Sequence, residues 1–171
     1  MHKLKTSELN RLSVDEFKEK PKHKVVLVLD NVRSLYNVGS IFRTADAFSV
    51  ESIYLCGITG TPPHKEIRKT AIGAEKSIDW QYFKTTQEAL DLLKKENYQI
   101  VAIEQTSDSI PLKKETIAKL PIALVFGNEV DGVALDIIKQ CAFSVEIPQF
   151  GTKHSFNVSV SVALVLWELL R

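Results

Sequence analysis

Two continuous apolar runs constrain the fold of this chain more than any other feature. Residues 25–29 read VVLVL and residues 122–126 read IALVF, with no polar side chain in either run. A strand with one face in water alternates apolar and polar residues, so an unbroken run indicates a strand covered on both faces. Such strands are typical of parallel sheets that lie between two layers of helices. The chain is therefore expected to be an α/β protein.

Four further segments predict strands, and helical patterns separate them. The strands are expected at 52–55, 80–83, 99–104 and 143–147, and the helices at 40–48, 86–96 and 135–140. Residues 111–120 are expected to be irregular or briefly helical. This alternation favours a mostly parallel, six-stranded sheet between helical layers. At 171 residues one domain is expected, with residues 1–24 as an N-terminal arm and residues 25–171 as the folded unit.

The C-terminal segment is nearly apolar from residue 158 to its end. Pro148 ends a strand because proline has no N–H to donate, and Ser155 and Asn157 are good helix caps. The following run, VSVSVALVLWELL, shows both the two-residue period of a strand and helical spacing. Its length and the helix propensity of its second half favour a helix. A helix that is apolar almost all round must be buried on more than one side, so a second subunit is expected to cover it.

Composition excludes several classes of protein. The net charge is +1, so binding to nucleic acid would depend on local patches of charge. Cys56 and Cys141 have no metal or redox spacing, which indicates reduced thiols in the cytoplasm. The four histidines have no ligand spacing, so no metal is expected. The N-terminus has no signal-peptide core, and no apolar run approaches the ~20 residues of a membrane-spanning helix.

The first 24 residues are basic. They carry seven Lys and Arg residues against four Asp and Glu residues, a net charge of +3. Ser13 and Glu16 form a capping box, which predicts a short helix over residues 14–20. The segment is either a solvated arm or a surface that contacts RNA.

Three polar loops, at 30–39, 127–132 and 148–155, each follow a predicted strand. Ligands of parallel sheets bind at the carboxyl ends of strands, so these loops indicate a site. The second loop, GNEVDG, offers backbone groups that suit an adenine ring and ribose, and it lacks the glycine-rich phosphate motifs. The alternative is that its glycines only make a turn and that Glu129 is a solvated acid.

In the first loop, Asn37, Gly39 and Arg43 mark a sharp turn into a helix. On periodicity alone the simpler interpretation is that Arg43 pairs with Asp46 and that Asn37 caps the helix. In the third loop, His154 and Ser155 do not indicate a hydrolase, because adjacent side chains diverge and there is no G-x-S-x-G motif.

Together the loops resemble the three signature motifs of the SpoU/TrmH family of RNA ribose 2'-O-methyltransferases, in the SPOUT superfamily. The resemblance covers residues 25–171. NVRSLYNVGSIFRTADAF is similar to the first motif, LVFGNEVDGV to the second and IPQFGTKHSFNVSVSVALVLWEL to the third. Gln149 and Phe156 stand where the family usually has Met and Leu.

The resemblance implies a fold, an assembly and a cofactor. The fold is a deep trefoil knot threaded by the C-terminal segment, a topology that general rules make very rare. The assembly is a homodimer through the C-terminal helix. The cofactor is S-adenosylmethionine, expected to contact Leu124, Phe126, Gly127, Asn128, Gly132, Ile147, Pro148, Gln149, Ser155, Phe156 and Asn157.

The implied reaction is methylation of a ribose 2'-hydroxyl in structured RNA. Its implied catalytic residues are Arg43, Asn37, Glu129, Ser155 and Asn157, with Asn37 ordering Arg43 within the chain or across a dimer. Arginine is effectively always protonated, so we interpret Arg43 as a cation that binds phosphate and lowers the pKa of the hydroxyl, rather than as a base. RNA is expected to contact Arg33, Lys65, Arg68 and Lys69.

Transfer RNA is the preferred substrate because the chain adds no RNA-binding domain or aromatic RNA motif, so a compact RNA would be recognised by its shape. Ribosomal RNA stays open. One alternative function is a non-catalytic RNA-binding protein, and the presence of Arg43, Asn37 and Asn157 argues against it. A second alternative is a methyltransferase of the same fold that modifies a base, and the first motif argues against that.

Overall fold

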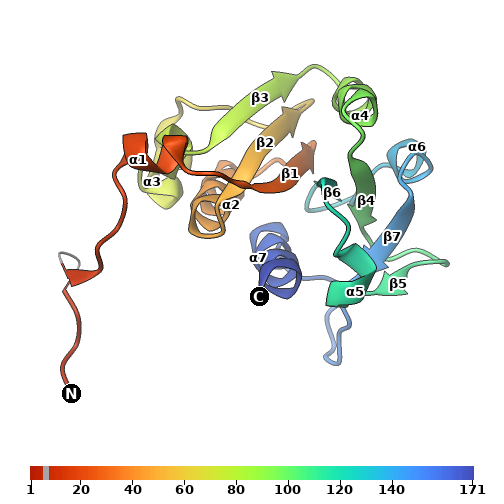
Figure 1. The fold of residues 1–171 in the computed structure, drawn as a ribbon. Coiled ribbons are helices and arrows are strands. Elements are labelled where there is room, and N and C mark those ends of the chain that lie inside the picture. Colours follow the sequence, from red (N-terminus) through yellow and green to blue (C-terminus); the bar gives the residue numbers. More distant parts are fainter. Residues whose placement is uncertain (6–7) are drawn as a thin grey trace.

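Seven parallel strands form the centre of the computed structural model, which describes residues 1–5 and 8–171 (Figure 1). They follow the order β3-β2-β1-β6-β4-β7-β5, and every neighbouring pair is parallel. The predicted α/β fold with a parallel sheet is confirmed. The strands are β1 (His23–Asp30), β2 (Val50–Cys56), β3 (Asp79–Phe83), β4 (Gln99–Ile103), β5 (Ile110–Pro111), β6 (Ile122–Phe126) and β7 (Phe143–Glu146).

The prediction of six strands is wrong by one. The additional strand, β5, has two residues and pairs with β7 at the edge of the sheet. Two residues show no periodicity, and one of them is Pro111, which cannot donate a ladder hydrogen bond. An edge strand tolerates such a residue because one of its sides has no partner strand.

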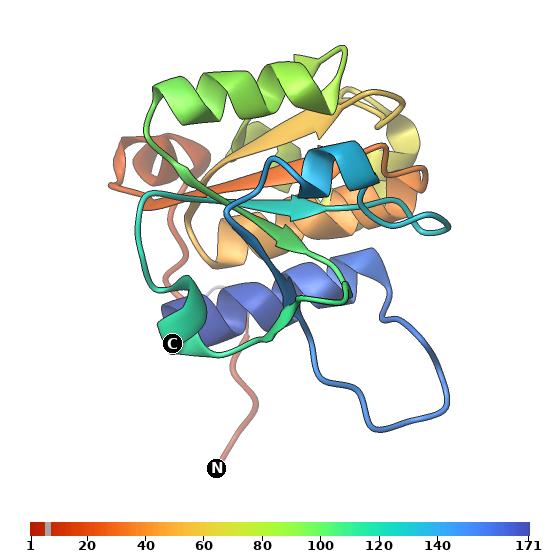
Figure 2. The same cartoon turned by 90° about the vertical axis from the view of Figure 1, so that its right-hand side faces the viewer.

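Helices cover both faces of the sheet (Figure 2). Side chains of β1 alternate between two cores: Val25, Leu27 and Leu29 pack with α2, α3 and α7, whereas Val26 and Val28 pack with α4 and α6. The expectation of strands buried on both faces is confirmed. The helices are α1 (Val14–Glu19), α2 (Leu35–Ala47), α3 (Lys65–Ala71), the 3-10 turn η2 (Ala74–Lys76), α4 (Thr86–Lys95), α5 (Lys114–Ile117), α6 (Leu135–Ile138) and α7 (Val158–Leu170).

Helix α2 begins at Leu35, five residues before the predicted start. Ser34 caps it by accepting a hydrogen bond from the backbone N–H of Asn37 at 3.3 Å. Asn37 and Gly39 therefore lie inside the helix, and their prediction as a sharp turn is wrong. Gly39 has a packing role instead, because a Cβ there would lie 2.1 Å from Thr70 Oγ1 and 2.2 Å from the Ile67 carbonyl oxygen. Glycine allows α2 and α3 to pack this closely.

Helix α7 is confirmed, and Asn157 is its N-cap. One face is buried in the protein and packs against α2. The opposite face carries Val160, Leu164 and Trp167, whose exposed fractions are 45%, 37% and 58%. A single chain therefore leaves an apolar stripe on this helix.

The N-terminal capping box is also confirmed, with Ser13 and Glu16 at the start of α1. Phe17 of this helix is buried against the main core, so the arm packs on the domain from α1 onward. Over residues 1–5 and 8–171, none of the helices combines the length and apolar character needed to cross a membrane.

Candidate functional site

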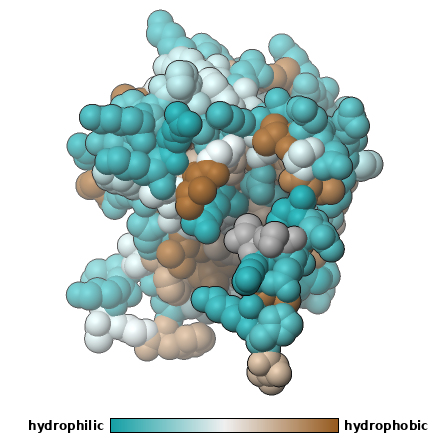
Figure 3. Space-filling view, turned by 90° about the vertical axis from the view of Figure 1, so that its left-hand side faces the viewer, coloured by the Kyte–Doolittle hydropathy of each residue, from teal (hydrophilic) through white to brown (hydrophobic). Residues whose placement is uncertain are grey.

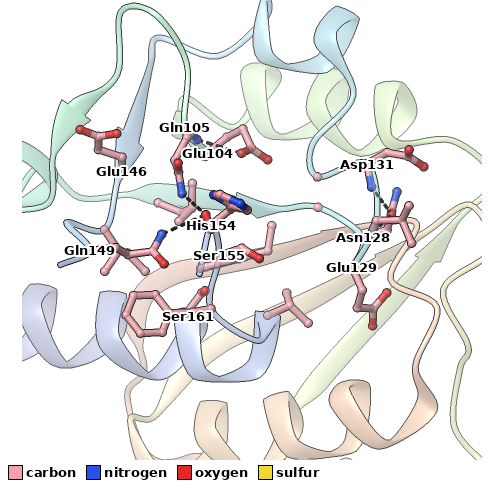
Figure 4. Close-up of a pocket in the computed structure, with 18 of the residues that line it drawn as sticks. Glu104, Gln105, Asn128, Glu129, Asp131, Glu146, Gln149, His154, Ser155 and Ser161 are labelled. Atoms are coloured by element: carbon pink, nitrogen blue, oxygen red, sulfur yellow. Dashed lines mark hydrogen bonds between the residues drawn. The ribbon is translucent and has the colours of Figure 1, made fainter. Parts of the chain in front are cut away.

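The carboxyl ends of β4, β6 and β7 open onto a cavity of about 330 Å³ (Figure 4). Because every strand runs in the same direction, the loops after these strands lie at the same end of the sheet. Two loops form the walls of the cavity: residues 127–134, here called the glycine loop, and residues 147–157, here called the C-terminal loop. The volume lies at the lower end of the range for small-molecule sites. Eight predicted cofactor residues line it: Phe126, Gly127, Asn128, Gly132, Ile147, Gln149, Ser155 and Phe156.

Three other predicted cofactor residues lie elsewhere. Leu124 is fully buried in β6, where its side chain belongs to the core. Pro148 and Asn157 line a neighbouring hollow within the C-terminal loop, which shares Gln149, Ser155 and Phe156 with the cavity.

The glycine loop is a closed turn. The backbone N–H groups of Asn128 and Gly132 each donate to the carbonyl of the other residue at 3.1 Å, and Asn128 Oδ1 accepts from the N–H groups of Val130 and Asp131 at 2.8 Å. A Cβ at Gly127 would lie 1.9 Å from the carbonyl carbon of Gly132, so no larger residue fits. The glycines do make a turn, and the same turn places bare backbone on the cavity wall.

Two carboxylates hold the glycine loop, one from each of the two strands that flank β6. Asp30 at the end of β1 is buried and accepts from the Ala134 N–H at 3.1 Å and from the Thr86 hydroxyl. Glu104, directly after β4, accepts from the Val133 N–H at 2.9 Å. We did not predict a role for either residue. The one signal in the sequence was an acid at the end of each apolar strand.

Glu129 joins all three loops. Its Oε1 accepts from Asn37 Nδ2 at 2.8 Å, and Asn37 Oδ1 accepts from Asn157 Nδ2 at 3.1 Å. The backbone N–H groups of Arg33 and Ser34 also donate to Glu129, at 3.0 and 3.1 Å. Glu129 is exposed, as a solvated acid would be, but these three hydrogen bonds also give its carboxylate fixed partners. Three of the five predicted catalytic residues form one hydrogen-bonded chain.

These hydrogen bonds control the ionisation of Glu129. Partial burial acts to raise its pKa, but the N–H donors of Arg33, Asn37 and Ser34 outweigh burial, and the pKa is lowered. Glu129 is thus a carboxylate at neutral pH. It acts as an acceptor that orders its neighbours.

Arg43 lies away from this chain of hydrogen bonds. It is exposed on α2 and is not among the residues that line the cavity. Six residues after Asn37, it is about 9 Å further along the helix and on another side. The alternative pair with Asp46 is wrong: Asp46 accepts from Ser77, and in the described part of the chain no carboxylate lies within 4.0 Å of the Arg43 guanidinium.

The C-terminal loop has fewer contacts. The carbonyl of His154 accepts from Gln105 Nε2 at 2.8 Å and from Gln149 Nε2 at 3.2 Å (Figure 4). Ser155, beside it, is exposed at the cavity wall. We did not predict a role for Gln105, because it follows a strand without any recognisable motif.

The cavity wall is acidic. Its lining includes the carboxylates of Glu104, Glu129, Asp131 and Glu146, and no Lys or Arg among the described residues. Such a lining favours a ligand with positive charge. The predicted RNA contacts lie outside it: Arg33 is exposed before α2, and Lys65, Arg68 and Lys69 are exposed on α3.

The fold and the cavity define a parallel α/β protein with an acidic cavity at the carboxyl ends of its strands. The model of the SpoU rRNA Methylase family matches residues 24–167. The chain therefore belongs to this family, as its three motifs indicated.

Curated relatives are similar over most of this chain. A protein of Staphylococcus haemolyticus assigned to the TrmH family of tRNA/rRNA methyltransferases is 28% identical over 161 residues, which cover 92% of this chain and 64% of the relative. A tRNA (guanosine(18)-2'-O)-methyltransferase of Borreliella burgdorferi is 28% identical over 146 residues, with coverage of 85% and 66%. The chain thus spans somewhat less than two thirds of the staphylococcal relative.

Solved structures support the same fold. The A. aeolicus TrmH/SpoU tRNA modifying enzyme superimposes with a TM-score of 0.81 at 28% identity, covering 92% of this chain and 79% of that one. The AdoMet-bound rRNA methyltransferase from Sinorhizobium meliloti gives a TM-score of 0.78 at 26% identity, covering 93% and 60%.

Proposed function

We propose that this protein transfers the methyl group of S-adenosylmethionine to a ribose 2'-hydroxyl of transfer RNA in the cytoplasm. The observation that carries the proposal is the hydrogen-bonded chain from Asn157 through Asn37 to Glu129, which joins the three motif loops beside the cavity. We assign the reaction to residues 25–171. The tRNA enzymes of Borreliella burgdorferi and A. aeolicus among the similar proteins support tRNA, and the rRNA methyltransferase of Sinorhizobium meliloti makes rRNA the alternative.

The cavity suits this cofactor. Its carboxylates complement a cationic sulfonium and ammonium group, and Phe126, Val145 and Ile147 offer apolar contact for an adenine ring. Gly127 and Gly132 line the cavity with backbone alone, and a Cβ at either position would collide with the loop backbone or with the Glu104 carboxylate. When bound, the cofactor supplies a methyl group activated by the sulfonium charge.

The residues of the chain contribute mainly by positioning. A displacement requires the attacking oxygen, the methyl carbon and the sulfur to be aligned. Holding these atoms in that geometry lowers the activation free energy by a large amount. The Glu129 carboxylate holds Asn37 and the start of α2, and Asn37 in turn accepts from Asn157. Ser155 stands at the cavity wall, where its hydroxyl can contact the nucleotide.

We assign stabilisation of the developing negative charge on the 2'-oxygen to Arg43. Within one chain Arg43 does not line the cavity, so we propose that a partner subunit provides it. The apolar stripe of Val160, Leu164 and Trp167 on α7 supports such a homodimer, since exposed apolar side chains that cluster on one helix face are typical of interfaces.

Changing Trp167 tests this assembly. Trp167→Glu should convert the dimer to a monomer in light-scattering measurements and abolish methyl transfer, while calorimetry still detects cofactor binding. Leu135→Glu is the matched control, because Leu135 is a 64% exposed leucine on α6, on the other face of the sheet. A wild-type protein that is monomeric at enzyme concentrations would refute the assignment of Arg43 to the partner.

We also propose the trefoil knot that the sequence motifs imply. In the sheet order two strands, β4 and β6, separate β7 from β1, yet α7 packs against α2 on the β1 side, so the chain after β7 must cross back. Single-molecule stretching from both termini should give a contour length shorter than that of an open chain. A full contour length would exclude a knot.

The reaction itself is tested with tritiated S-adenosylmethionine and separate preparations of tRNA and rRNA from a strain that lacks the protein. Nuclease digestion and mass spectrometry should find a 2'-O-methylated nucleoside in tRNA. Arg43→Ala should abolish transfer with cofactor binding nearly unchanged in calorimetry, and equal losses of both would contradict the role of Arg43. A methylated base, methylation of rRNA alone, or no transfer to either RNA would each overturn the proposal.

A further inference from the structure

A second hollow, of about 610 Å³, lies beside α3 and away from the cofactor cavity. Its walls are the Pro62–Pro63 pair, α3, η2 and the side chain of Trp80 on β3. The surface on the side of α1 and α3 is mostly hydrophilic, with hydrophobic residues in separate groups (Figure 3). None of the motif residues lines the hollow.

The rim of the hollow is positively charged. Lys65, Arg68, Lys69 and Lys76 line it and are exposed, against the single carboxylate of Glu75. Within residues 1–5 and 8–171 none of these four cations forms an ion pair. Their charge is thus available to an anionic ligand, and phosphate groups are the common anions that bind several Lys and Arg side chains at once.

The inner wall offers a surface for stacking. Trp80 is half-buried and packs against the main core, so its ring is held in place while it lines the hollow. Bases of unpaired RNA stack on aromatic side chains, and any base can do so.

The hollow is connected to the methyl-transfer site through α2 and α3. Thr70 on α3 donates to the carbonyl of Tyr36 at 2.9 Å, and the Lys69 ammonium lies 5.9 Å from the centre of the Tyr36 ring. Tyr36 directly precedes Asn37. One RNA molecule can therefore contact α3 and reach the start of α2.

We propose that this hollow binds an unpaired nucleotide of the substrate RNA. The base stacks on Trp80, and the phosphates on either side lie against Lys65, Arg68, Lys69 and Lys76. The identity of the RNA as a substrate rests on the function proposed above, whereas the stacking contact requires no methyl transfer.

Tryptophan fluorescence tests the stacking directly, since the chain has two tryptophans. In Trp167→Phe, Trp80 is the sole tryptophan, and a short single-stranded oligoadenylate should quench its emission. A blunt RNA duplex of similar charge should quench it far less. In Trp80→Phe the remaining Trp167 should respond to neither RNA.

Affinity measurements provide the second test. Trp80→Leu should weaken binding of oligoadenylate by about tenfold, because one stacked base is lost. Lys76→Ala does not touch the core and should lower the slope of log affinity against log salt by about one. Unchanged emission of Trp80 together with unchanged affinity in both variants would overturn the inference.

These results separate the two proposals. An enzyme that methylates RNA with the same KM for RNA in the wild type and in Trp80→Leu, and without quenching of Trp80, refutes the hollow and leaves the reaction in place. A protein that shows the quenching but no methyl transfer supports the hollow as an RNA site and refutes the proposed reaction.

Discussion

The two loops that enclose the cavity are built in opposite ways. The glycine loop closes on itself through paired backbone hydrogen bonds and is held by Asp30 and Glu104 from two neighbouring strands. The C-terminal loop projects from the sheet: Phe150 is 98% exposed, and a Cβ at Gly151 would meet no atom within 4 Å. One wall of the cavity is thus preorganised, and the other has few contacts that fix it.

This difference suggests a division of labour. Binding costs less conformational entropy when the loop that contacts the ligand is already ordered. The glycine loop is therefore suited to set the shape of the proposed cofactor site. A loop with few buried contacts belongs to the low-stability part of a fold, and such loops commonly close over ligands. Ser155 and Asn157 lie on that loop, so cofactor binding is expected to order them.

The largest difference between the two loops is expected when a glycine in each of them is changed to alanine. Gly127→Ala places a Cβ 1.9 Å from the carbonyl carbon of Gly132, so it should destabilise the protein by about 3 kcal/mol and abolish cofactor binding. The matched variant Gly151→Ala should change stability by less than about 0.5 kcal/mol. Urea unfolding and calorimetry with S-adenosylmethionine measure both. Similar losses in the two variants would show that the loops do not differ as described.

Removing a carboxylate that holds the glycine loop is expected to have the next largest effect. Asp30→Ala leaves the Ala134 N–H and the Thr86 hydroxyl without their acceptor, which should cost about 2 kcal/mol. Asp131→Ala is the control, because Asp131 is exposed on the same loop and should change stability by less than about 0.5 kcal/mol. An Asp30 variant as stable as wild type would show that the loop is closed by its backbone alone.

A smaller effect, dependent on pH, is expected at Glu129. Its pKa is lowered in the folded protein, so its contribution to stability is complete above the unfolded pKa and is lost as pH falls through the folded pKa. Wild type should therefore be more stable than Glu129→Gln at neutral pH, by less than the effect of Asp30→Ala. The two proteins should converge in acid. A difference that is constant with pH would rule out the ionised carboxylate as its source.

The smallest effect on stability is expected within the C-terminal loop. Gln149→Ala removes one exposed hydrogen bond to the His154 carbonyl, so the unfolding free energy should change by less than about 0.5 kcal/mol. Trypsin cleavage after Lys153, however, should become faster, and saturating S-adenosylmethionine should slow it. Cleavage after the exposed Lys139, the C-cap of α6, is the internal control. If the cofactor does not protect Lys153, the loop does not close over it.

Much of the fold was predictable because its signals are local. Two-sided apolar runs identified β1 and β6, and the length and propensity of the C-terminal run identified α7. Capping residues such as Ser13 and Asn157 were recognised from their side chains. The exceptions were short or atypical: β5 has two residues, and the start of α2 contains a glycine that breaks the helical pattern.

The site was predictable in its residues more than in its geometry. The motifs predicted Asn37, Glu129 and Asn157 as site residues, and the structure brings these three together. In the sequence, Asn37 is 92 residues from Glu129 and 120 residues from Asn157. Asp30, Glu104 and Gln105 carry no motif, so their roles depend on which strands are neighbours.

By itself the sequence determined that the chain forms an α/β fold with a parallel sheet and that three polar loops follow its strands. It also determined that those loops carry the motifs of one family. These properties depend on period, propensity and residue type, which are read along the chain. Only the tertiary structure decided that Asp30 and Glu104 hold the glycine loop, that Gly39 serves packing between α2 and α3, and that Arg43 lies away from the cavity of its own chain. The reason is physical: strand order and helix rotation set these contacts, and both result from the burial of the whole core.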